Sequence, residues 1–278
     1  MRTVLIAMVL LFHYCHAQTR HRLLEDPKAL SAAQKSIVSI SARDSTFPGA
    51  LYAIGTGVLV SVSGRLFVLT TGDQFTITDS SQKFVRHLSQ FQVDLSNPDG
   101  TTRSIPASLA CTDDDNDLIA LDVPCFNEDS SAVSLFSLAS IALTRRMSLA
   151  DCHLGDSVLC ICRRKAEREE WGSYLVTQTG TILRCFADRS LLLVGALLEE
   201  PEAGSGVFVT RQAGSCTVPI LIGLARDANG ETIASLLNGD GNMTDASWEE
   251  VDTHILGLVT SVDAIVPILI SHCDSIHR

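Results

Sequence analysis

The sequence lacks any apolar run long enough to cross a membrane, and it lacks an excess of positive charge. The apolar run Val4–Phe12 spans nine residues, whereas a membrane-spanning helix needs about 20. The later stretch His254–Ile270 is interrupted by Asp263, a residue type that costs about 2.5–3.5 kcal/mol at a bilayer centre. Lysine and arginine number 21 against 32 acidic residues, and nucleic-acid binders need the opposite balance. We therefore expect no membrane anchor and no nucleic-acid partner.

Residues 1–17 have the layout of a secretory signal peptide. Arg2 supplies a short basic start, Val4–Phe12 forms the apolar core, and Ala17 is a small residue at a suitable cleavage point before Gln18. Apolar cores of signal peptides run about 7–15 residues. Neighbouring residues offer alternative cleavage points. We expect the mature chain to be secreted into the extracellular space, where its partner is an extracellular protein of unknown identity.

Eight of the nine cysteines lie beyond this segment. They are Cys111, Cys125, Cys152, Cys160, Cys162, Cys185, Cys216 and Cys273. An even number of cysteines in an exported chain is typical of a disulfide framework, although the sequence does not choose among the pairings. Cys160 and Cys162 could instead belong to a metal site, but zinc ligands are more often spaced by two or more residues. We therefore expect disulfides, and neither a metal nor a cofactor.

Beyond residue 36 the chain consists of short apolar runs separated by turn residues. Val58–Val62 and Leu66–Leu69, joined by Ser63 and Gly64, form a predicted hairpin. Leu191–Leu198 is an apolar run suited to a buried strand. Many short strands of this kind predict an all-β protein built as a sandwich or as barrels.

The strands fall into two sets. We expect a first β-barrel over residues 36–126, an inter-barrel connection over residues 127–150 that is rich in serine and alanine, and a second β-barrel with a C-terminal helix over residues 151–278. Residues 18–35 form a leader segment that is either loose or contains one short helix. All-β proteins of this size often form one structural unit.

The C-terminal helix is indicated by apolar residues at helical spacing between Val262 and Cys273. Ser261 is a candidate N-cap residue for it. Pro267 lacks the backbone donor that a helix interior needs. It fits the helix only if the helix starts late enough to place the proline in its first turn.

Three short motifs resemble those of the trypsin-like serine peptidases, and they stand in that family's order. Gly55–Val60 followed by Leu66–Asp73 is similar to the family's first hairpin, whose last position holds the catalytic histidine. Asp117–Leu121 is similar to the segment whose aspartate orients that histidine. Ala203–Gly206 is similar to the loop that carries the nucleophilic serine.

This resemblance extends over residues 36–271, nearly the whole mature chain. It implies two packed antiparallel β-barrels. It also implies that Asp117 and Ser205 occupy the positions of two members of a catalytic triad, at the junction between the barrels. In an active member of the family, a histidine between them accepts the serine proton and passes it to the leaving group.

The resemblance fails at the position of that histidine, which is Asp73 in this chain. A carboxylate with a pKa of about 4 is a poor base for a serine hydroxyl at neutral pH. Two other histidines, His87 and His153, stand outside any matching motif. Ala203 replaces the glycine whose backbone N–H helps to form the family's oxyanion hole.

We therefore expect a secreted trypsin-like serine peptidase homologue that is catalytically inactive and has a binding or regulatory role. Asp117 and Ser205 would then be remnants of an active site. The alternative is an active secreted serine endopeptidase that uses Ser205 with an unrecognised base. A third interpretation is a purely structural extracellular protein. Serine-directed reagents distinguish the first two, because only an activated Ser205 reacts with them quickly.

The exported protein is expected to start at Gln18 and to carry a glycan on Asn242, the first residue of an Asn-Met-Thr sequon. N-terminal sequencing of secreted material tests the cleavage point. Glycosidase treatment should lower the mass of the parent protein and leave the mass of an Asn242→Gln variant unchanged. Secreted protein that still begins at Met1 would contradict the first expectation.

Overall fold

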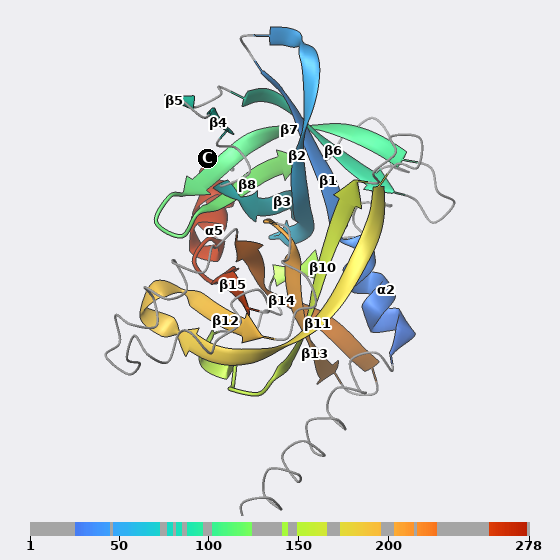
Figure 1. The fold of residues 1–278 in the computed structure, drawn as a ribbon, viewed down its shortest axis with the longest axis vertical. Coiled ribbons are helices and arrows are strands. Elements are labelled where there is room, and N and C mark those ends of the chain that lie inside the picture. The colour runs from blue at the N-terminus through green and yellow to red at the C-terminus, as the bar shows by residue number, and fades with distance from the viewer. Residues whose placement is uncertain are drawn as a thin grey trace, which may run out of the picture.

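Strands make up most of the structured chain, with one helix near each end. The computed structural model describes residues 26–44, 47–72, 77–79, 82–84, 88–96, 102–123, 141–143, 149–165, 173–195, 203–213, 216–226 and 256–276. Figure 1 shows the strands in two stacked groups, with the green and blue strands of the first group above the yellow and orange strands of the second. Asp73, Asn242 and the signal segment lie outside the described residues.

The first group of strands is a closed antiparallel barrel. Its strands in spatial order are β1 (Ile37–Asp44), β6 (Leu88–Ser96), β7 (Thr102–Asp113), β8 (Leu118–Val123), β3 (Arg65–Thr71) and β2 (Phe47–Val62). The pairing of β1 with β2 closes the ring. The short strand β9 (Ile141–Ala142) adds to β2 in parallel, and β4 (Ile77–Asp79) pairs with β5 (Gln82–Phe84) as a separate ribbon.

The second group of strands is also a closed antiparallel barrel. Its strands in spatial order are β10 (Ser157–Lys165), β11 (Ser173–Phe186), β12 (Leu191–Gly195), β15 (Leu256–Ser261), β14 (Cys216–Arg226) and β13 (Gly206–Ala213). Two short 3-10 helices, η3 (Leu149–Asp151) and η5 (Ala187–Arg189), flank its strands. The predicted all-β fold of two packed barrels with a C-terminal helix is therefore confirmed.

The hairpin between β2 and β3 forms where the sequence predicts it. Ser63 and Gly64 occupy the turn, with φ angles of 50° and 79°, and Val62 stands opposite Arg65. Two central residues with positive φ give a two-residue turn the twist that antiparallel strands need. Glycine adopts such angles without a steric penalty, which explains its place in this turn.

One cluster of buried apolar side chains runs from the first barrel into the second. It includes Val58 and Phe67 of the first barrel together with Ile161 and Phe208 of the second. Leu269 of the C-terminal helix packs in the same cluster. These side chains have at most a trace of solvent exposure. Because the cluster is shared, neither barrel can separate without exposing apolar surface from both.

The N-terminal helix α2 (Pro27–Lys35) packs on both barrels, against β1 and β14. Asp26 caps it, since its side chain accepts hydrogen bonds from the backbone N–H groups of Lys28 and Ala29. Gln34, near the other end, donates a side-chain hydrogen bond to Thr177 of β11. The leader segment therefore contains a helix that is tied to the second barrel.

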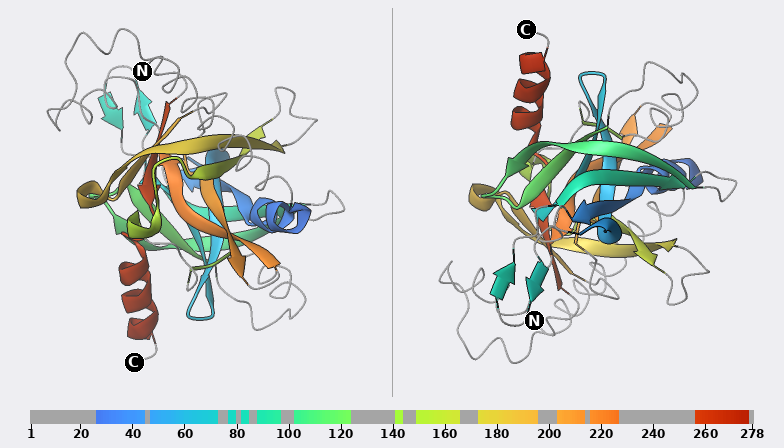
Figure 2. Two further views of the ribbon diagram at one scale, coloured as in Figure 1. Left: turned by 90° about the horizontal axis from the view of Figure 1, so that it is seen from below. Right: turned by 90° about the horizontal axis from the view of Figure 1, so that it is seen from above.

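The C-terminal helix α5 (Val266–Ile276) packs against β7 of the first barrel. Pro267 lies in its first turn, where its missing N–H has no cost. Ser261 is not its N-cap residue, because the helix begins only at Val266. The Ser261 hydroxyl instead accepts a hydrogen bond from the backbone of Asp263, in the turn before the helix. Figure 2 shows α2 and α5 on different sides of the molecule.

Phe208→Ala is expected to lower the free energy of unfolding by about 3–5 kcal/mol, because it removes a fully buried ring from the shared cluster. Urea unfolding followed by fluorescence and by circular dichroism measures the loss, and both signals should change in one transition. Leu109→Ala is the control, since Leu109 is 53% exposed. A loss below about 1 kcal/mol for Phe208→Ala would mean that this ring is not part of a common core.

Candidate active site

The Asp117 carboxylate lies against the end of β3. Asp117 ends the turn between β7 and β8 with a φ of 55°, a conformation in which aspartate is more common than most residues. Its carbonyl accepts a hydrogen bond of 3.1 Å from the N–H of Gly72. A Cβ on Gly72 would come within 2.5 Å of the Asp117 Oδ1 atom. Glycine therefore leaves space for this carboxylate, which would have to shift if another residue stood at position 72.

The charge of Asp117 is paired with Arg226, the last residue of β14. The Nε atom of Arg226 lies 3.6 Å from the Oδ2 atom of Asp117. The two side chains are 27% and 17% exposed, so the ion pair is largely shielded from water. This contact joins a turn of the first barrel to a strand of the second. Arg226 thus occupies one side of the carboxylate that an active triad would direct at a histidine.

The segment Ala203–Ser205 forms a tight turn before β13. Gly204 has a φ of 78°, which favours glycine, and its N–H donates a 2.8 Å hydrogen bond to the carbonyl of Ala225. The N–H of Ala225 donates in return to the carbonyl of Ser205 at 2.9 Å. These two bonds fix the turn against the end of β14.

The Ser205 side chain is fully buried. Its hydroxyl forms a hydrogen bond with the thiol of Cys160 on β10. Burial raises the pKa of Cys160, and this hydrogen bond acts in the opposite direction with a smaller effect. A nucleophilic serine must reach its substrate, whereas this hydroxyl is buried and hydrogen-bonded to a thiol.

Asp117 and Ser205 are connected through two successive residues of β14. Ala225 holds Ser205 through its backbone, and Arg226 holds Asp117 through its side chain. The structure therefore brings both sequence-predicted site residues to the junction of the barrels. Asp73, the third predicted site residue, lies outside the described residues, as does His87.

Gly206, which follows Ser205, has a packing role of its own. A Cβ at this position would lie 2.7 Å from the ring of Phe208 and 2.8 Å from Val58 of the first barrel. Any side chain here would push the barrels apart. The Gly-Ser-Gly sequence is thus explained by a positive φ at its first residue and by inter-barrel packing at its last.

Two residues of the Gly-Thr-Gly sequence of β2 have structural roles, Thr56 at the junction and Gly57 inside the first barrel. Thr56 is fully buried, and its hydroxyl donates to the carbonyl of Arg163 at 3.1 Å and accepts from the N–H of the same residue at 3.3 Å. These bonds join β2 of the first barrel to β10 of the second. A Cβ on Gly57 would lie 2.5 Å from Val68, so glycine is needed for close packing.

The two described histidines have partners elsewhere. His153 lies before β10 with its side chain 76% exposed, and its Nδ1 atom is 3.8 Å from the Oδ2 atom of Asp156. The ring of His272 on α5 packs edge-on against Phe67, with centroids 6.3 Å apart. Neither contact orients a base toward Ser205.

Six cysteines have described side chains, and all six are free thiols. They are Cys111, Cys152, Cys160, Cys162, Cys185 and Cys273. The expected disulfide framework is therefore not formed among these six. The described residues also contain no cluster of three or more histidine, cysteine, aspartate or glutamate side chains that could hold a metal ion. Within the same residues, no helix has the length and apolarity needed to span a membrane.

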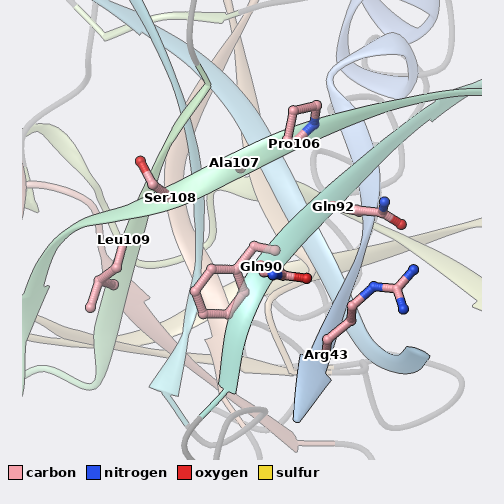
Figure 3. A pocket seen from close by; sticks show the side chains of 8 residues that line it. Arg43, Gln90, Gln92, Pro106, Ala107, Ser108 and Leu109 are labelled. Carbon is pink, nitrogen blue, oxygen red and sulfur yellow. The ribbon is translucent and has the colours of Figure 1, made fainter. Parts of the chain in front are cut away.

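A cavity of about 510 Å³ lies on β1, β6 and β7, and neither Asp117 nor Ser205 lines it. Polar side chains on its walls are Arg43, Gln90, Gln92 and Ser108. Figure 3 shows that Arg43 and Gln92 point to the same side of the strands. Leu109 adds an apolar side chain that is 53% exposed. The cavity therefore combines hydrogen-bond donors with apolar surface on the first barrel.

No family model and no curated protein sequence matches the chain. Solved structures match its fold. A serine endoprotease from Yersinia pestis aligns over 88% of this chain and 65% of its own, with 16% identity and a TM-score of 0.50. The HtrA-type protease AlgW, solved with a tripeptide, aligns over 87% of this chain and 62% of its own, with 16% identity and a TM-score of 0.50. The MamO protease domain from Magnetospirillum magneticum aligns over 87% of this chain and 97% of its own, with 14% identity and a TM-score of 0.49.

These likenesses establish the fold of the chain. It has the trypsin-like two-barrel fold of serine-protease domains. The chain spans less than two thirds of the length of the Yersinia and AlgW structures. At such low identity, a shared fold does not carry an activity with it.

Sequence reasoning did not find Arg226 or Cys160 as parts of this site. Arg226 ends the apolar run of β14, where a charged residue normally marks the return of a strand to solvent. Cys160 was assigned only to a disulfide or a metal. Their contacts join residues far apart in the sequence, so no local pattern could have indicated them.

Arg226→Ala is expected to lower the free energy of unfolding by about 1–3 kcal/mol, since it leaves the shielded Asp117 carboxylate without its ion-pair partner. Urea unfolding measures the change. Adding Asp117→Asn should cost less in the Arg226→Ala background than in the parent, because the two residues interact directly. Arg189→Ala is the matched control, since the Arg189 side chain is 42% exposed. Additive effects of Arg226→Ala and Asp117→Asn would show that the pair is not coupled.

Proposed function

We propose that this chain is a secreted protein with a serine-peptidase fold that binds an extracellular partner and does not cleave peptides. The observation that carries the proposal is the ion pair of Asp117 with Arg226. In a working triad, the aspartate stabilises the positive charge that forms on the histidine. Here a permanent guanidinium charge already lies beside that aspartate.

The residue at the histidine position adds to this argument. Asp73 directly follows Gly72 in the sequence. An aspartate is ionised at neutral pH and holds its proton too weakly to deprotonate a serine hydroxyl. It also lacks the second nitrogen with which an imidazole contacts serine and aspartate at once. Triads that lose one member keep about 10³–10⁴-fold catalysis over water only where the oxyanion hole and substrate binding survive.

The surroundings of Ser205 point in the same direction. Its side chain is buried, and its hydroxyl is engaged with Cys160. Attack on a peptide carbonyl would require the hydroxyl to leave this contact and reach solvent. The positive φ of Gly204 and the close packing at Gly206 account for this loop without any catalytic role.

An active endopeptidase would need a base beside Ser205, and neither of the two described histidines makes a contact that places it there. His153 is held by Asp156, and His272 packs on Phe67. A binding role instead uses the outer surface of the barrels. The cavity lined by Arg43 and Gln92 supports such a role, because it offers donors and apolar surface away from Asp117 and Ser205.

The purified protein is expected to hydrolyse neither peptide nor ester substrates and to resist labelling by a fluorophosphonate, with an active trypsin as the positive control. Ser205→Ala should leave the midpoint of thermal unfolding within a few degrees of the parent value. Asp73→His alone should not create activity, because Arg226 still pairs with Asp117. A hydrolysis rate present in the parent and lost in Ser205→Ala would overturn the proposal and favour the active endopeptidase.

The binding role has its own test, since inactivity alone fits a structural protein equally well. The secreted protein, cross-linked in its native fluid, should yield one dominant adduct. An Arg43→Ala, Gln92→Ala double variant should lose that adduct if the cavity is the contact surface, whereas Arg189→Ala should retain it. Recovery of the parent without any adduct would favour the structural interpretation.

A further inference from the structure

Cys152 and Cys185 lie side by side at one end of the second barrel. Cys152 follows the short helix η3, and Cys185 lies near the end of β11. The thiol of Cys185 donates a hydrogen bond to the carbonyl oxygen of Cys152, with the sulfur and oxygen 3.7 Å apart. Both side chains pack in the same apolar cluster. The sulfur of Cys185 therefore contacts the backbone of Cys152, and both cysteines are free thiols whose sulfurs are not at bonding distance.

Backbone hydrogen bonds hold the segment between Cys152 and β10 against β11. The antiparallel ladder of β10 with β11 begins at Ser157 and Thr181, and two further bonds lie just before it. The N–H of Gly155 donates to the carbonyl of Ile182 at 2.8 Å, and the N–H of Ile182 donates to the carbonyl of Asp156 at 2.9 Å. The chain turns before Asp156, since the N–H of Asp156 donates to the carbonyl of His153 at 3.1 Å. Cys152 directly precedes this turn, and its carbonyl there accepts the hydrogen bond from Cys185.

The environment does not favour a reactive thiolate at either residue. Burial, followed by the neighbouring Cys185, raises the pKa of Cys152 to about 12. Burial also raises the pKa of Cys185, with a contribution from Asp156. Catalytic cysteines need the opposite, a lowered pKa. A disulfide between the two would remove both titrating groups from this apolar and acidic setting.

We propose that Cys152 and Cys185 form a disulfide when the protein meets an oxidant that itself contains a disulfide, R–S–S–R. Cys185, the more exposed of the two, loses its proton and attacks the oxidant. A mixed disulfide forms, and the first RS⁻ leaves and takes up the proton. Cys152 then loses its proton and attacks the sulfur of Cys185 in the mixed disulfide, which releases the second RSH. The protein loses two hydrogens, and the oxidant is reduced to two thiols.

This inference is independent of the proposed loss of peptidase activity. Export through an oxidising compartment would supply such an oxidant. The bond would close a loop between cysteines 33 residues apart that contains β10 and most of β11. Closing a loop of this length restricts the unfolded chain and thereby stabilises the fold.

Cys160 and Cys162 provide an internal comparison. They lie two residues apart on one strand, so their side chains project from the same face and do not point toward each other. Both are buried. They are therefore expected to remain thiols under conditions that oxidise the other pair.

Oxidised glutathione is the probe for the test. The full-length protein is reduced, freed of reductant and incubated with oxidised and reduced glutathione. Free thiols are then alkylated, and the protein is digested and mapped by mass spectrometry without reduction. The expected product is one cross-linked peptide that joins Cys152 to Cys185, with Cys160 and Cys162 alkylated. Its formation should raise the midpoint of thermal unfolding by roughly 5–15 °C.

Variants separate this pair from other pairings. Cys185→Ser should abolish the cross-linked peptide and the rise in the unfolding midpoint, whereas Cys162→Ser should preserve both. Recovery of Cys152 and Cys185 as alkylated thiols in the parent, or of either one linked to a different cysteine, would overturn the inference. The mapping of the parent protein gives this answer even if a variant fails to fold.

Discussion

Close packing at the junction of the two barrels is the constraint on which the rest of the structure depends. Val58 of the first barrel and Phe208 of the second meet over Gly206, where a Cβ would lie within 2.8 Å of both side chains. Thr56 bonds across the same junction to the backbone of Arg163. Because interiors of this density tolerate little change of volume, the strand ends at the junction are held in fixed positions. The turn that carries Ser205 directly precedes one of these strands, β13.

The same constraint would let a site keep its shape even if its chemistry were lost. Gly72 makes room for the Asp117 carboxylate, and Gly204 supplies the left-handed turn before Ser205. Both glycines thus have a structural reason that is independent of peptide cleavage. The pairing of Asp117 with Arg226, in contrast, involves only their side chains. It coexists with the backbone hydrogen bonds of Gly72 to Asp117 and of Ala225 to Ser205. Packing therefore preserves the geometry of the motifs, and electrostatics decides what they can do.

The sequence predicted the fold where local patterns carry the information. Short apolar runs separated by turn residues predicted the strands, and Ser63 with Gly64 predicted the first hairpin. It did not predict the ion pair of Asp117 with Arg226, because that contact joins a turn of the first barrel to a strand of the second. The N-cap assigned to Ser261 was wrong, since the turn after Ser261 delays the start of the helix to Val266. Local periodicity locates a helix but not the residue at which tertiary contacts let it begin.

Each terminal helix contacts the barrel that lies farther from it along the chain. The helix α2 precedes the first barrel yet packs on β14 of the second, and α5 follows the second barrel yet packs on β7 of the first. Each half of the chain therefore contributes one terminal helix that packs on the other half. A proteolytic nick in residues 127–150 would leave two fragments that remain associated, because the shared cluster and both helices still join them. The intact polypeptide link between the barrels is thus not what keeps them together.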